Sequence, residues 1–194
     1  MAANTDKPFR LTPLQHSVPL ATLAGMSRYH RAWQPGGTWF FTLNLADRRR
    51  SLLTDHVAVL RRVVRQVQQR HPFTVHGWVV LPEHLHCVLE LPATDSDFAL
   101  RWRLIKGHFS RSIPPGEFIS LSRRRHGERG IWQRRYWEHR IRNERDYRMH
   151  MDYLHFNPVK HGWVTRVRDW PYSTFHRLVA MGVYAEDWGG AMAI

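Results

Sequence analysis

The stretch from residue 79 to residue 91 constrains the fold of this 194-residue chain more than any other. It reads Val79-Val80-Leu81-Pro82-Glu83-His84-Leu85-His86-Cys87-Val88-Leu89-Glu90-Leu91 and is rich in β-branched and other apolar residues. Because proline interrupts a strand, the pattern predicts two strands joined by a turn at Pro82, which is an antiparallel hairpin. An isolated hairpin is only marginally stable, so the rest of the chain must supply partners for it.

The segments around the hairpin predict those partners. Apolar periodicity and turn residues indicate strands at 38–45, 73–81, 84–91 and 136–142, and helices at about 54–71, 95–112 and 143–157, with a short fourth helix after 169. The third helix is expected to begin at Asn143 and to end near Asn157, because Pro158 follows. The order matches an α+β fold of the ferredoxin-like split βαβ type, with helices on the faces of a central antiparallel sheet and extra C-terminal helices. The hairpin strands are expected to lie centrally in that sheet.

The length fits one domain with a sizeable core, predicted at 26–194. Residues 1–25 show no clear period and contain three prolines, so they are predicted to form a flexible extension. Residues 116–131, which include Arg123-Arg124-Arg125, are predicted to form a mobile basic loop.

The charge of the chain points to a polyanionic partner. Lys and Arg number 29 against 16 Asp and Glu, which gives a formal net charge of +13, and nucleic acid is the default partner for such a surface. The single cysteine, Cys87, excludes an internal disulfide and a zinc site built from several cysteines, which favours the cytoplasm. No apolar run approaches the roughly 20 residues of a membrane span, so no membrane partner is expected.

Two histidines and a tyrosine form the candidate site. Residues i and i+2 of a strand share a face, so His84 and His86 stand side by side, an arrangement that suits a divalent metal ion. On the third predicted helix, Tyr153 and Asn157 lie one turn apart, so an amide oxygen could complete a metal site beside a tyrosine nucleophile. The plain alternatives are two half-buried histidines on a sheet, a half-buried tyrosine beside the core, and an asparagine that ends a helix.

Several motifs resemble known families. Pro82-Glu83-His84-Leu85-His86 is similar to the His-hydrophobic-His motif of HUH single-strand DNA nucleases. The runs at 36–42, 132–139, 152–164 and 169–175 resemble the REP-associated tyrosine transposases, in the same order. The resemblance covers roughly residues 26 to 188.

This resemblance implies a function. Tyr153 would be the nucleophile, and His84, His86 and Asn157 would hold Mg²⁺ or Mn²⁺. The family cleaves single-stranded DNA beside REP hairpins and leaves a 5′-phosphotyrosine and a free 3′-OH. The expected place of work is the bacterial cytoplasm, in association with the nucleoid. Whether the protein is a monomer or a homodimer is left open by the sequence.

Arginines interleaved with aromatic residues predict how DNA is held. Between residues 123 and 148 there are ten arginines and four acidic residues, with Trp132, Tyr136 and Trp137 among them, a pattern that suits single strands because charge follows the backbone and rings stack on bases. Trp137 lies on the inward alternation of its strand and is expected in the core. The residues predicted to bind DNA are Arg101, Arg103, Lys106, Arg123, Arg124, Arg125, Arg134 and Arg135.

Two other functions remain open at this stage. One is a non-catalytic protein that binds hairpin DNA. The other is a different HUH nuclease, such as a relaxase or a replication initiator, although those enzymes often carry additional domains and this chain is short.

Overall fold

A four-stranded antiparallel sheet forms the centre of the protein. The computed structural model describes residues 35–189, so the extension predicted at 1–25 lies outside the described residues. The sheet order is β2-β3-β1-β4, which is the strand order of the ferredoxin-like split βαβ fold. The strands are β1 (Gly37–Asn44), β2 (Thr74–Val80), β3 (His84–Leu91) and β4 (Trp137–Arg140).

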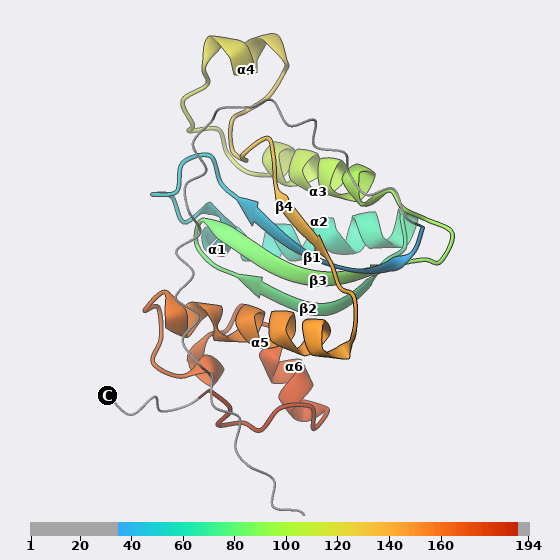
Figure 1. Ribbon diagram of the computed structural model, residues 1–194. Helices are drawn as coiled ribbons and strands as arrows, with labels where there is room; N and C mark the ends of the chain where they lie inside the picture. Colours follow the sequence, from blue (N-terminus) through green and yellow to red (C-terminus); the bar gives the residue numbers. More distant parts are fainter. Residues whose placement is uncertain (1–34, 190–194) are drawn as a thin grey trace, which may run out of the picture. The chain divides into compact units, whose positions relative to one another are not determined.

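Helices cover both faces of this sheet, as Figure 1 shows, and the predicted α+β class is confirmed. The helices α2 (Val57–Arg70) and α3 (Phe98–Ser112) lie on one face, and α5 (Glu144–Lys160) and α6 (Phe175–Ala180) lie on the other. The shorter elements are α1 (Leu52–Asp55), α4 (Leu121–Arg125) and the 3₁₀ helix η1 (Val167–Asp169). None of the helices within residues 35–189 has the length and apolar character needed to cross a membrane.

The hairpin is not central, contrary to the prediction from sequence. β2 is an edge strand, because within the four-stranded sheet it pairs only with β3. The other side of β3 pairs with β1, and β1 lies between β3 and β4. The outer edge of β2 is covered by the segment at 172–174: the amide of Val80 donates to the carbonyl of Tyr172, and the amide of Thr174 donates to the carbonyl of Trp78. β3, which carries the two histidines, is still an interior strand.

The alternation along the strands divides the core into two parts. Leu85 and Cys87 of β3 point towards α2 and α3 and join the larger cluster of buried side chains. Val88 belongs to the smaller cluster with Met151 and Leu154 of α5. Because side chains two positions apart share a face, His84 and His86 lie on the α5 side of the sheet, opposite Cys87.

Helix α5 begins as predicted and ends later than predicted. The side chain of Asn143 accepts a hydrogen bond from the amide of Asp146, which caps the first turn. The helix continues past Pro158 to Lys160. Proline removes only its own amide donor, and the last turn is still closed by the amide of His161, which donates to the carbonyl of Asn157.

The basic segment 116–131 contains ordered elements. Ser120 caps α4 by accepting from the amide of Arg123, and Arg129 forms an ion pair with Glu117. The mobility of this segment stays a prediction, but the segment contains a short helix, α4. In Figure 1, α4 stands away from the sheet at the top of the view.

Candidate functional site

The two histidines of β3 meet the C-terminal half of α5. The rings of His84 and His86 lie 4.9 Å apart, centre to centre, and both side chains are buried. Asn157 is fully buried beside them, and its Oδ1 lies 3.3 Å from Nε2 of His84. Three of the residues singled out in the sequence are therefore in one place, on one side of the sheet.

Both imidazoles are oriented through their Nδ1 atoms. Nδ1 of His84 lies 2.9 Å from a carboxylate oxygen of Glu83, and Nδ1 of His86 lies 2.8 Å from Oγ1 of Thr42. A carboxylate can only accept, so Nδ1 of His84 donates and, in the neutral ring, Nε2 carries a free lone pair. Such outer contacts fix the tautomer of metal-binding histidines, and here they direct the Nε2 edge of His84 towards Asn157.

Two buried polar atoms of the site have no hydrogen-bond partner among residues 35–189: Nε2 of His86 and Nδ2 of Asn157. Burial lowers the pKa of His86 well below its ordinary value, and the neighbouring positive charges act in the same direction, with a smaller opposite effect from the Asn157 amide. His86 is therefore neutral at physiological pH. A neutral imidazole with a buried, unpaired nitrogen is in the form that a metal ion binds.

The donor set fits a divalent cation. Two imidazole nitrogens and one amide oxygen are suitable ligands, and the remaining positions would be left for water or substrate oxygens. Adjacent ligands of an octahedral ion at about 2.1 Å lie about 3 Å apart, close to the 3.3 Å between Nε2 of His84 and Oδ1 of Asn157. With Nδ1 of His84 donating to Glu83, Nε2 of His84 and Oδ1 of Asn157 are both acceptors, and such a pair would suit a divalent cation.

Tyr153 lies at the exposed edge of this cluster. Its side chain is 40% exposed, and its ring packs edge-on against His86 with 5.3 Å between ring centres. Phe40 contacts it from the sheet at 6.0 Å. The ammonium of Lys160 lies 4.9 Å from the centre of the tyrosine ring, within range of a cation–π interaction. The tyrosine is thus reachable from solvent while its ring is held against the buried histidines.

Four residues of this neighbourhood were not assigned from the sequence: Thr42, Glu83, Lys160 and His161, whose ring lies 5.2 Å from that of His84. Glu83 directly precedes His84 and could have been noticed. Thr42 needed the register in which it faces His86 across β1 and β3. Lys160 and His161 follow Asn157 at helical spacing. They were not assigned to the site because the helix was expected to end near Asn157, before Pro158.

A second cluster of potential ligands is formed by His139, Asp146 and His150. The carboxylate of Asp146 already accepts hydrogen bonds from Nε2 of His139 and from the amide and Nε of Arg142. The two imidazoles stack at 4.6 Å with 14° between their planes, so their in-plane lone pairs run nearly parallel and do not converge on one point. This arrangement is a hydrogen-bonded ring stack more than a metal centre.

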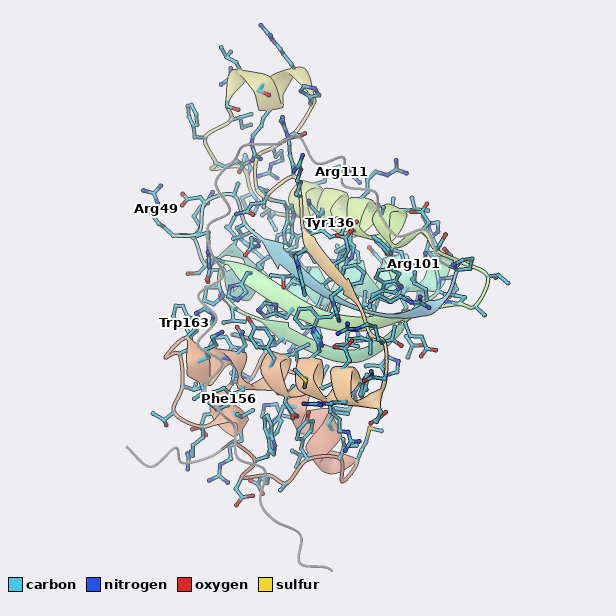
Figure 2. The ribbon with its side chains drawn as sticks, in the orientation of Figure 1. Arg49, Arg101, Arg111, Tyr136, Phe156 and Trp163 are labelled. Atoms are coloured by element: carbon cyan, nitrogen blue, oxygen red, sulfur yellow. The ribbon has the colours of Figure 1, made fainter. Side chains whose placement is uncertain are left out.

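Arg101 is a correction to the predicted DNA-binding set. Its side chain is 1% exposed, and its Nη2 donates to Asp95 and to the carbonyl of Pro72 at 2.7 and 2.6 Å. Figure 2 labels it within the body of the protein, whereas Arg49 extends into solvent. Arg101 connects the start of α3 to the end of α2, and its buried guanidinium is not accessible to a phosphate.

The other predicted DNA contacts differ in their surroundings. Arg103, on α3, is exposed on the face of the sheet opposite Tyr153. Lys106 donates to the carbonyls of Gln133 and Arg134. The remaining ones lie around α4 and before β4: Arg123 donates to the carbonyl of Trp132, Arg134 pairs with Glu128, and Arg124, Arg125 and Arg135 are exposed. Except for Arg101, these assignments stay predictions.

Trp137 is not a core residue, contrary to expectation. Its side chain is 54% exposed. The predicted alternation is right, because Trp137 pairs with Thr42 on β1 and so lies on the same face as His86. However, β4 is an edge strand of only four residues, and α5 does not cover its first position.

Comparisons with known proteins agree on one family. A family model described as "Transposase IS200 like" matches residues 41–157. A REP-associated tyrosine transposase of Escherichia coli K12 is 51% identical over 165 residues, covering 85% of this chain and 92% of that protein. A Haemophilus influenzae protein provisionally given the same name is 44% identical over 166 residues, covering 85% and 94%. Among solved structures, a REP-associated tyrosine transposase bound to a REP hairpin superposes with a TM-score of 0.74 at 50% identity, covering 87% of this chain and 94% of the other.

Proposed function

Because this chain belongs to the IS200-like transposases and, within them, to the REP-associated tyrosine transposases, we propose that it cleaves and rejoins single-stranded DNA at REP hairpins through Tyr153. The observation that carries the proposal is the exposed phenol of Tyr153, packed on His86 next to His84 and Asn157. The relative of similar fold was solved with a REP hairpin bound, and the net charge of +13 suits the same partner here.

The chemical step is an exchange of phosphodiester bonds. The phenol oxygen of Tyr153 loses its proton and attacks phosphorus, the bond from phosphorus to the 3′ oxygen breaks, and that oxygen leaves as a 3′-OH after taking up a proton. The DNA 5′ end is then joined to the enzyme as a phosphotyrosine. Attack by a 3′-OH on this linkage reverses the step, so the strand is rejoined without an external energy source.

His84, His86 and Asn157 are the residues that would hold Mg²⁺ or Mn²⁺. When bound, such an ion polarises a phosphate oxygen and helps to orient the phosphodiester. Glu83 and Thr42 hold the two imidazoles through their Nδ1 atoms, and Nε2 of His84 faces the amide. The chain therefore fixes the ligand geometry before DNA arrives.

Lys160 is placed to assist Tyr153. The ammonium of Lys160, 4.9 Å from the centre of the ring, supplies a fixed positive charge. The same charge would attract the phosphate that Tyr153 attacks.

The DNA-holding surface is proposed to comprise Arg103, Lys106, Arg123, Arg124, Arg125, Arg134 and Arg135. Most of these side chains lie around α4 and the segment that leads into β4. A protein with this substrate would work in the bacterial cytoplasm, at the nucleoid.

The test is the formation of a covalent adduct. Wild-type protein incubated with a labelled REP hairpin that has a single-stranded extension at each end, plus Mn²⁺, is expected to give a denaturation-resistant complex. Tyr153→Phe should give no adduct and should bind the hairpin about as tightly as wild type, whereas Tyr172→Phe, a control tyrosine in the segment beside β2, should react normally. Hairpin binding by a wild-type protein that forms no adduct would refute the proposal and favour a non-catalytic binding protein. Cleavage of strands without REP hairpins would favour another HUH nuclease.

A further inference from the structure

Three aromatic rings from two elements form a column next to Tyr153. Trp137 stacks on His139 with 5.8 Å between ring centres and 5° between planes, and His139 stacks on His150 at 4.6 Å and 14°. Trp137 and His139 come from β4, and His150 comes from α5. The column ends at Trp137, whose indole is 54% exposed.

Asp146 braces the column from the first turn of α5. Nε2 of His139 donates to its carboxylate at 3.0 Å, and Nδ1 of His150 donates to its main-chain carbonyl at 2.8 Å. The carboxylate also accepts from the amide and Nε of Arg142 at 3.1 and 3.0 Å. Burial tends to raise the pKa of Asp146, but the hydrogen bonds from His139 and Arg142 hold it well below its ordinary value, so the carboxylate stays ionised. The rings under Trp137 are therefore fixed.

The indole lies close to the proposed nucleophile on the same face of the sheet. Phe40 contacts Trp137 at 5.7 Å and Tyr153 at 6.0 Å, ring centre to ring centre. These two distances limit the separation of the Trp137 and Tyr153 rings to about 12 Å, which is about three to four stacked nucleotides at 3.4 Å each. The indole therefore lies within reach of a base that is a few nucleotides from a phosphate at Tyr153.

We propose that Trp137 is a stacking platform for one nucleobase of the single strand next to the cleaved bond. The inference rests on the proposed function and deepens it, because it names a residue that positions the strand. An exposed ring supported from behind by parallel rings offers a flat face without first having to be ordered, and every base has a face that can stack on it. Arg135, two residues before Trp137, is also exposed, so its positive charge is available to the strand.

The test combines protein variants with abasic DNA. The ligand is the REP hairpin with a single-stranded extension at each end, in which one nucleotide at a time, within four positions of the cleaved bond, is replaced by an abasic residue. Affinities are measured in the Tyr153→Phe background, so that no strand is cleaved. Trp137→Ala should weaken binding of the intact strand by about 5- to 150-fold, the range expected for one lost stacking contact. Trp137→Phe should recover part of this loss, and Trp163→Ala, which removes a similarly exposed tryptophan outside the column, should have little effect.

The decisive measurement is the coupling between Trp137→Ala and each abasic substitution. At one position the abasic residue should weaken binding as much as Trp137→Ala does, and the two changes together should cost no more than either alone. Losses that multiply at every position, or wild-type affinity of Trp137→Ala, would overturn the proposal. Thermal unfolding of Trp137→Ala close to that of the parent protein would show that the loss is not a folding defect. Coupling in a protein whose wild-type form gives no Tyr153 adduct would uphold the stacking platform and refute the proposed function, so the two failures are distinguishable.

Discussion

At the scale of single residues, the site depends on side chains that would not touch the DNA. Glu83 is the clearest example, because its carboxylate accepts a hydrogen bond from Nδ1 of His84 and lies 3.5 Å from a guanidinium nitrogen of Arg48. Burial tends to raise the pKa of Glu83, but the hydrogen bond from His84 and the nearby positive charges lower it overall. The residue therefore stays a carboxylate, and a carboxylate accepts the Nδ1 proton and leaves Nε2 free.

We expect Glu83→Ala to raise the Mn²⁺ concentration that gives half-maximal adduct formation by about 10- to 100-fold, the usual cost of losing an outer contact of a metal-binding histidine. Glu90→Ala is the matched control: it removes an acid near the far end of β3, where Glu90 contacts His76 and not His84. A Mn²⁺ titration of adduct formation, together with Mn²⁺ binding followed by electron paramagnetic resonance, measures the effect. An unchanged Mn²⁺ requirement in Glu83→Ala would mean that Glu83 does not orient a metal ligand.

At the scale of elements, the position of α5 relative to the sheet determines where Tyr153 and Asn157 meet the histidines. One close approach is at Gly77 of β2, where a Cβ atom would lie 2.6 Å from Sδ and 2.9 Å from Cε of Met151. Met151 is itself buried in the same cluster as Leu81 and Val88, so it has little room to move. The absence of a side chain at Gly77 lets the helix lie close to the strand.

We expect Gly77→Ala to lower the free energy of unfolding by about 1–3 kcal/mol, as overpacking in a core does. The control has the opposite expected sign: Gly107→Ala on α3 meets only the flexible end of Arg111, and alanine is favoured over glycine within a helix by about 1 kcal/mol. Urea denaturation of both variants gives the comparison. Equal stability of Gly77→Ala and wild type would show that Met151 can move aside and that Gly77 does not limit the approach of α5.

The elements were largely predictable from the sequence, and their pairing was less so. Local patterns predicted the strand with the two histidines and the capped start of α5 at Asn143, because period and caps are local properties. The insertion of β1 between β3 and β4 is a long-range property, and so is the contact of Thr42 with His86. Two local rules failed for identifiable reasons: Pro158 removes one donor without ending α5, and Trp137 faces inward on an edge strand that no helix covers there.

At the scale of the whole molecule, charge and chemistry occupy different parts of the fold. Tyr153 and its neighbours lie between the sheet and α5, whereas Arg124 and Arg125 are exposed on α4, away from the sheet. The net charge of +13 would attract DNA to any face of the protein. Only local contacts to phosphates, however, release counterions and determine how steeply binding depends on salt.

This difference gives a prediction for the double variant Arg124→Ala/Arg125→Ala. If both side chains contact phosphates of the hairpin, the slope of log affinity against log salt should become shallower by about two, one for each contact. The double variant Arg61→Ala/Arg65→Ala removes the same charge from exposed positions of α2 and should keep the wild-type slope. Fluorescence anisotropy of a labelled hairpin over a range of salt concentrations measures both. If the salt slope becomes equally shallow in both variants, the hairpin responds to net charge alone, because α2 and α4 would then be equivalent. If the slope changes only in the α4 variant, the duplex stem lies on the basic segment at 116–131, and the face of Tyr153 is left for the single strand.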